Sequence, residues 1–266
     1  CTNGRRPAGG TEEFFRNLVA FIIALATMVR HKEVFQVEKG NWKYMILRAG
    51  FGTLGILCNF YAVDHLVLSD ASMLNKMSPF FVILFSFLIL KEKLTPIQVT
   101  AVCGAFIGSL FIIKPTFLNM NIVPSLIGLC GGLCAGIAYT MVRVLGQRGQ
   151  KGVSVVLFFS GFSCLVTLPY LLLNYHTMSM WQGIVLLGAG VAAAGGQFAI
   201  TAAYYHAPAR EISVYDYSQI IFSAIIGFAL FHQIPDRYSV LGYVIIIGMA
   251  VWMFFYNQRR DASDVK

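Results

Sequence analysis

Long apolar runs, separated by short polar segments, dominate the pattern along this chain. Each run is close to the length needed to cross a hydrocarbon layer of roughly 30 Å at 1.5 Å per residue. The runs are continuous, whereas a membrane barrel needs alternating segments of about ten residues. We therefore predict an all-α, polytopic membrane protein, a helical bundle with nine visible spans, at residues 14–29, 44–66, 71–90, 97–113, 124–145, 153–173, 181–205, 212–231 and 238–256.

Lys and Arg residues gather in alternate loops, and this bias predicts which side of the membrane each loop faces. The loops of one side hold Arg30, Lys32, Lys39, Lys43, Lys91, Lys93, Arg143, Arg148, Lys151, Arg210, Arg259, Arg260 and Lys266. The internal loops of the other side hold only Lys114 and Arg237. We expect a cytoplasmic C-terminus and a first visible helix that starts outside. Arg5, Arg6 and Arg16 depart from the rule, which fits an outer loop at 1–13 preceded by a helix that is missing here.

An internal repeat relates the two halves of the chain. Residues 71–113 and 211–253, which are 140 positions apart, both have the pattern of a helix, a short polar turn and a second helix. The predicted orientation places the two turns, at 91–93 and 231–237, on opposite sides of the membrane, so the repeat is inverted. We predict a first repeat at 1–115, incomplete at its N-terminus, a second at 123–258 and a cytoplasmic tail at 259–266, where a complete pair has five plus five helices.

Composition agrees with the membrane interpretation. Hydrophobic residues make up 57% of the chain and charged residues 12%, against about 25% charged in soluble domains. The net charge of +8 comes from the short loops, so we do not expect nucleic-acid binding. No Cys or His spacing typical of a metal site is present, and we expect reduced packing thiols, without metal or cofactor, at Cys58, Cys103, Cys130, Cys134 and Cys164.

Lys76 is a charged residue about six residues inside an apolar span. Such a charge costs about 2.5 to 3.5 kcal/mol on insertion scales, so something must compensate it. In the functional interpretation, Lys76 faces a wet cavity and binds a carboxylate, phosphate or carbonyl of a substrate. In the structural one, its side chain extends to the outer interface or pairs with Asp70 or Asp64.

Asp216 holds the position equivalent to Lys76 in the second repeat. With Gln219 and Ser223 it forms a polar stripe on one helix face. Asp216 is a candidate for substrate binding, opposite Lys76 on a zwitterion, or for proton coupling. The alternative is a structural carboxylate near the helix end.

Other polar side chains inside the spans are candidate substrate ligands or ordinary helix–helix contacts. We include Asn75, Tyr139, Gln197 and Tyr215 as substrate-binding candidates. Small residues recur at four-residue spacing, which lets helices approach closely. They are Gly128, Gly132 and Gly136 in one span and Gly104 and Gly108 in another.

Several of these segments together resemble the EamA-type drug/metabolite transporter superfamily. They are Phe14-Phe15-Arg16-Asn17 opening a helix, Ser78-Pro79 before an apolar run, and Lys91-Glu92-Lys93-Leu94-Thr95-Pro96 at the following turn. The resemblance covers nearly the whole chain and implies a ten-helix, two-repeat secondary transporter with a central cavity. The chain departs from it in lacking the first helix and in having His232-Gln233-Ile234-Pro235 where the second repeat usually has an acidic turn.

A secondary-active transporter of a small metabolite, working by alternating access, explains these features best. No catalytic motif or metal-ligand cluster supports the alternative of an integral membrane enzyme, and a non-transporting structural protein needs no repeat. No phosphate-binding loop for ATP is present. Amino acids and related compounds are our expected substrate class, because one cation and one anion suit a zwitterion. We expect the protein in the cell's inner or plasma membrane, with lipid and a small solute as partners; a homodimer is left open.

Overall fold

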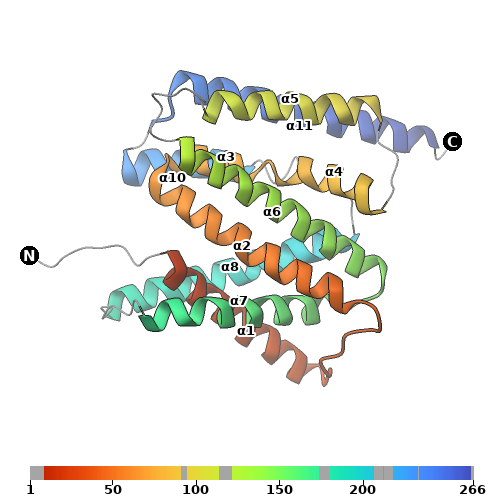
Figure 1. The fold of residues 1–266 in the computed structure, drawn as a ribbon, viewed down its shortest axis with the longest axis vertical. Coiled ribbons are helices and arrows are strands. Elements are labelled where there is room, and N and C mark those ends of the chain that lie inside the picture. Colours follow the sequence, from red (N-terminus) through yellow and green to blue (C-terminus); the bar gives the residue numbers. More distant parts are fainter. Residues whose placement is uncertain are drawn as a thin grey trace, which may run out of the picture. The chain divides into compact units, whose positions relative to one another are not determined.

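The computed structural model describes residues 9–90, 95–113, 122–173, 180–206, 212, 218–232 and 234–264. Every regular element in these ranges is an α-helix, which confirms the predicted all-α class (Figure 1). Six segments in the described part are long and apolar enough to cross a membrane, and a shorter apolar helix lies at Val99–Ile112.

Most predicted spans coincide with helices to within a few residues. These helices are α1 (Gly9–Arg30), α2 (Trp42–His65), α5 (Pro96–Ile113), α6 (Ile122–Gln147), α7 (Gly152–Leu173) and α8 (Met180–His206). In the second half, α10 (Ser218–Phe231) forms the end of the predicted span at 212–231, and 213–217 lie outside the described residues. The last helix, α11 (Arg237–Asp264), continues into the segment predicted as a tail.

The predicted span at 71–90 is not one helix. It consists of α3 (Leu68–Asn75) and α4 (Ser78–Leu90), which are separated at Lys76 and Met77. Pro79 explains the interruption, because proline has no N–H to donate and its ring clashes with the carbonyl four residues earlier, here that of Asn75. The backbone closes α3 with a tight turn in which the Met77 N–H donates to the Leu74 carbonyl at 3.2 Å.

The described chain falls into two compact units, and the first comprises residues 1–53 and 141–206. Within it, α1 packs against α7 and α8 (Figure 1). The apolar contacts centre on Ala24 and Met28 of α1 and on Val156 and Leu157 of α7. Beside the α6–α7 turn, the Gln150 amide donates to the Gln36 carbonyl at 2.8 Å and fixes the loop that joins α1 to α2.

The second unit comprises residues 54–140 and 207–266. Here α5 lies along α11, and α3 packs against α10 (Figure 1). Its core is rich in methionine and phenylalanine, including the fully buried Met73, Met77 and Phe80. Helices α2 and α6 each cross from one unit into the other, so their two halves are described separately.

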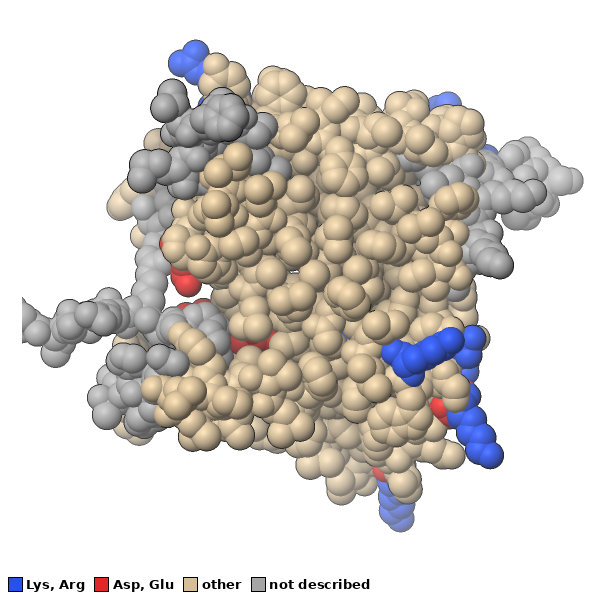
Figure 2. Space-filling view, viewed as in Figure 1, with Lys and Arg blue, Asp and Glu red and all other residues tan. Residues whose placement is uncertain are grey.

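The outer surface is unusually apolar for a folded chain. Large hydrophobic side chains stand exposed on α2, α7, α8, α10 and α11, including Leu165, Leu173, Trp181 and Phe228. The face drawn in Figure 2 carries few Lys, Arg, Asp or Glu side chains. Soluble monomers rarely expose such extended apolar patches, so this surface fits contact with lipid.

Candidate functional site

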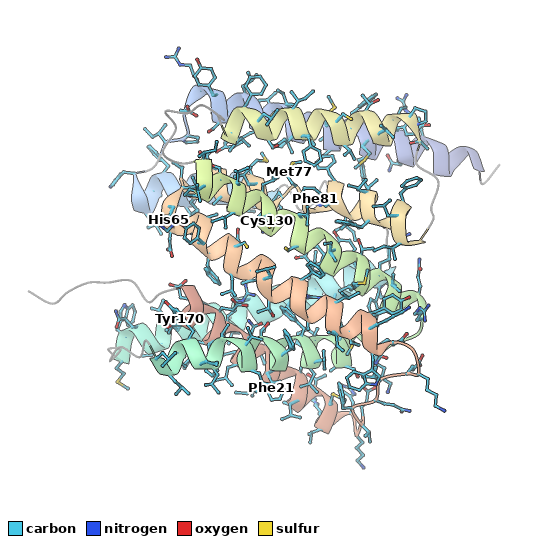
Figure 3. All side chains as sticks on the ribbon, viewed as in Figure 1. Phe21, His65, Met77, Phe81, Cys130 and Tyr170 are labelled. Carbon is cyan, nitrogen blue, oxygen red and sulfur yellow. The ribbon has the colours of Figure 1, made fainter. Side chains whose placement is uncertain are left out.

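The interruption between α3 and α4 places Lys76 at a non-helical position inside a candidate membrane span, which runs from Asp70 to Ile89. Lys76 and the preceding Asn75 are half-buried, whereas Met77 is fully buried. Figure 3 labels Met77 at the break and Phe81 one turn into α4. A break of this kind frees backbone groups from helical hydrogen bonds, and such groups can serve a solute where they line a cavity.

The glycine face of α6 packs directly onto this break. A methyl group added at Gly132 would lie 2.6 Å from the Leu74 carbonyl oxygen and 3.3 Å from that of Asn75. A methyl at Gly136 would overlap Phe81 and lie 3.1 Å from the Ser78 carbonyl oxygen. The close helix approach predicted from the four-residue spacing is therefore confirmed, and it supports the interrupted backbone on one side.

A second close approach joins α5 to α11. A methyl at Gly108 would lie 3.1 Å from the Gly242 carbonyl oxygen, and one at Gly104 would lie 2.6 Å from the Met249 side chain. This contact pairs one helix from each half of the sequence. The predicted packing role of Gly104 and Gly108 is confirmed.

Asp70 takes part in a hydrogen bond between two helices. It is buried near the start of α3 and accepts a hydrogen bond from the Tyr243 hydroxyl of α11. This bond ties the first half of the interrupted span to the last helix. Asp70 thus has a structural role in addition to any interaction with Lys76.

The other predicted site residues are distributed over the chain. Tyr139, on α6, is half-buried in the second unit, together with Asn75 and Lys76. Gln197 belongs to α8 in the first unit, where its amide donates to the Thr201 hydroxyl one turn later at 3.3 Å. Tyr215 and Asp216 lie outside the described residues, and Gln219 is placed in α10 only by its backbone. The roles assigned to these residues stay predictions.

One intramembrane charge was missed by the sequence analysis. Arg48 lies in α2, six residues after its first residue, and is only 2% exposed. Its guanidinium stacks on the Phe159 ring of α7, with 4.0 Å between the guanidinium carbon and the ring centroid. A methyl at Gly52 would overlap the guanidinium, so the close approach requires glycine there. The sequence did contain a signal for this site, because Arg48 is the single arginine within the apolar run at 44–66.

Two buried hydroxyl groups belong to the same unit as Arg48. The Tyr205 hydroxyl of α8 and the Ser160 hydroxyl of α7 are buried with no hydrogen-bond partner in the described part of the chain. The Tyr205 ring itself packs over Gly146, where an added methyl would meet it at 2.8 Å.

Among the described residues, no group of three or more His, Cys, Asp or Glu side chains could hold a metal ion. The cysteines predicted to be reduced thiols are free in the structure, namely Cys58, Cys103, Cys130, Cys134 and Cys164.

Comparison with known proteins shows related sequences along most of the chain. The model of the EamA-like transporter family matches residues 13–114 and 126–255. The pseudopaline exporter of Pseudomonas aeruginosa is 31% identical over 237 residues, which cover 88% of this chain and 82% of that protein. The riboflavin transporter of Brucella anthropi is 26% identical over 258 residues, covering 94% and 88%. Human solute carrier family 35 member G1 is 24% identical over 251 residues, covering 89% and 69%.

A solved crystal structure shares the fold, with a TM-score of 0.66 at 16% identity over 93% of this chain and 88% of the other. The family and the named relatives are transporters rather than enzymes. The chain therefore belongs to the EamA-like transporter family and is an integral membrane transporter.

Proposed function

We propose that this protein is a secondary-active carrier that moves a small metabolite across the membrane by alternating access. The observation that carries the proposal is the interruption of the span from Asp70 to Ile89 at Lys76 and Met77. In many secondary transporters the solute binds near discontinuous helices, because their free backbone groups and exposed helix ends can coordinate it. The ammonium group of Lys76, at this break, would attract an anionic group of the solute.

The helix boundaries of the two halves support the inverted repeat that alternating access uses. Helices α5 and α11 begin at Pro96 and Arg237, 141 positions apart. The segments that match the family model, 13–114 and 126–255, lie within the proposed repeats 1–115 and 123–258. Rocking of one repeat against the other would then open the binding site to each side in turn.

The substrate class that we propose is amino acids and related amphiphilic metabolites. Lys76 would bind a carboxylate, and Asp216 would bind an amino group or carry the coupling proton. The side chains of Asn75, Tyr139, Gln197, Tyr215 and Gln219 would supply hydrogen bonds. Two relatives are named as an exporter of pseudopaline and a transporter of riboflavin, which supports a small-molecule cargo.

We also propose an orientation in the cell's inner or plasma membrane, with the C-terminus cytoplasmic. The support is the bias of Lys and Arg toward alternate loops. The helix α11 carries Arg259 in its last turns, beyond the candidate span that ends at Tyr256. That position suits an inner membrane surface rich in anionic lipid.

Untargeted metabolite profiling tests the proposal. Cells and medium would be compared with and without the protein, and with Lys76→Ala in place of the wild type. Lys43→Ala is a matched control, because Lys43 is an exposed lysine at the start of α2. We expect one or more zwitterionic metabolites to change with the wild type and with Lys43→Ala but not with Lys76→Ala, at equal membrane expression. A wild-type profile identical to that of cells lacking the protein would refute the proposed function.

A further inference from the structure

We propose that an apolar groove between α1 and α7 holds an acyl chain of an anionic phospholipid, whose headgroup lies on the basic loop that joins α1 to α2. All of the residues that line the groove belong to the first unit. The inference goes beyond the proposed function, because it concerns a lipid rather than the transported solute and requires no particular transport mechanism. Neither the family match nor the names of the relatives assign a lipid site to this chain.

The groove has a volume of about 290 Å³ and only apolar residues line it. This volume equals that of roughly ten water molecules in the liquid, so the groove is larger than an ordinary packing gap. Most of the lining comes from one face of α7, between Leu157 and Leu165, and Phe21 of α1 and Phe35 of the loop complete it. Water would find no hydrogen-bond partner on these walls, whereas a hydrocarbon chain needs none.

The groove runs from the membrane surface into the hydrocarbon layer. Phe35, at one end, belongs to the loop between α1 and α2, which contacts the start of α7 through Gln150. At 1.5 Å per residue, Leu157 lies about 8 Å and Leu165 about 20 Å along α7 from its first residue. Leu165 is exposed, so the deeper end of the groove is open to lipid. An acyl chain that descends from the headgroup region would follow the same direction.

Aromatic and apolar side chains place the mouth of the groove at the level of the lipid headgroups. Val34 and Phe35 are both exposed in the loop, although they are apolar. Trp42, the first residue of α2, is also exposed, and its ring packs edge-on against Phe158 of the groove, with 5.7 Å between ring centroids. Tryptophan is enriched at membrane–water interfaces, which supports this depth.

The charge of the segment at 30–41 selects the kind of lipid. Its exposed basic residues are Arg30, Lys32 and Lys39. Of its two carboxylates, Glu33 already pairs with Lys151 at 2.9 Å, which leaves Glu38 against three cations. Figure 2 shows Lys and Arg side chains gathered around this loop, at the lower right. Basic residues next to a span attract anionic headgroups, each by about fivefold, so we infer an anionic rather than a neutral phospholipid.

Tryptophan fluorescence tests the site, because bromine atoms on an acyl chain quench a tryptophan only at short range. The chain has three tryptophans, and Trp181→Phe together with Trp252→Phe leaves Trp42 as the reporter beside the groove. The purified protein would be reconstituted into mixed vesicles of phosphatidylglycerol and phosphatidylcholine, with one lipid brominated at a time. We expect phosphatidylglycerol to bind beside Trp42 at least about fivefold better than phosphatidylcholine. A protein that retains only Trp181, an exposed residue at the start of α8, should show no such preference.

Two substitutions test the two parts of the site. Lys32→Gln should lower the preference for phosphatidylglycerol about fivefold, whereas Arg237→Gln, at the exposed start of α11, should leave it unchanged. Gly161→Leu places a side chain in the groove and should weaken the quenching of Trp42 by both brominated lipids. Its control is Gly188→Leu on α8, where an added methyl meets nothing within 4 Å. If Gly161→Leu fails to fold, Lys32→Gln still tests the site, because Lys32 is exposed.

Three results would overturn the proposal. Equal binding of both lipids beside Trp42 would indicate ordinary surrounding lipid, and an equal preference at Trp181 would indicate a general attraction to the protein. No quenching of Trp42 by either lipid, together with cross-linking between two copies at Leu165→Cys, would indicate an interface between copies. Metabolite profiling does not enter this test, so the lipid site and the proposed function can fail separately.

Discussion

Gly132→Ala is expected to destabilise the protein by forcing α6 away from the interrupted helix. The added methyl would lie 2.6 Å from the Leu74 carbonyl oxygen, well inside normal contact distance. That oxygen belongs to the backbone of α3, so no flexible side chain can move aside. The clash therefore has to be relieved by a shift of one helix against the other.

The magnitude follows from two opposing terms. Overpacking in a close-packed interior costs about 1 to 3 kcal/mol, whereas Gly→Ala within a helix gains about 0.8 to 1 kcal/mol. Gly195→Ala, inside α8, is the matched control because nothing lies within 4 Å of its added methyl. The two variants should differ by about 1 to 3 kcal/mol in stability, which is roughly 2 to 12 °C in Tm for a protein of this size.

The assay can use a thiol already in place. Cys134 lies two residues after Gly132 on α6 and is buried, so a thiol-reactive fluorophore reaches it only when α6 separates from its neighbours. The other five cysteines, Cys1, Cys58, Cys103, Cys130 and Cys164, would be replaced by serine to remove their background. Heating in detergent then reports the temperature at which Cys134 becomes reactive. Equal temperatures for Gly132→Ala and Gly195→Ala would refute the close contact between α6 and the break.

Three further predictions concern topology and transport. On a cysteine-free background, a cysteine placed at Gln233 should react with a membrane-impermeant probe added from outside. A cysteine in the loop at 91–93 should react only when the probe is added from inside. Reaction of both cysteines from the same side would exclude an inverted repeat. Lys76→Ala should abolish or strongly weaken transport at near-normal expression, with partial recovery in Lys76→Arg, and wild-type flux in Lys76→Ala would favour the structural role. Asp216→Asn should retain counterflow in liposomes and lose pH-driven accumulation if this carboxyl group carries the coupling proton; unchanged pH-driven accumulation would exclude it.

Helix positions could be predicted from the sequence because hydropathy alone decides which segments enter a bilayer. The runs at 153–173 and 181–205 correspond closely to α7 and α8. The glycine contacts of α6 were also accessible, since small residues at four-residue spacing face one partner. Neither inference needs knowledge of how distant segments meet.

The interruption at Lys76 was harder to predict, because the apolar run continues through it and hydropathy does not register backbone geometry. Pro79 was a local signal, yet proline is tolerated inside many membrane helices, as Pro169 is in α7. The contact between Arg48 and Phe159 joins residues that are more than 100 positions apart in the sequence. It could be recognised only once α2 and α7 were placed together.

Counterflow in proteoliposomes tests the central claim most directly. Liposomes with the purified protein would be preloaded with a candidate solute from the profiling, and a trace of the labelled solute would be added outside, without ATP or an ion gradient. An alternating-access carrier predicts that labelled solute accumulates transiently above its outside concentration, saturably, and that protein-free liposomes show no such rise. Label that only equilibrates, with a rate that does not saturate, would contradict a carrier and indicate a channel instead.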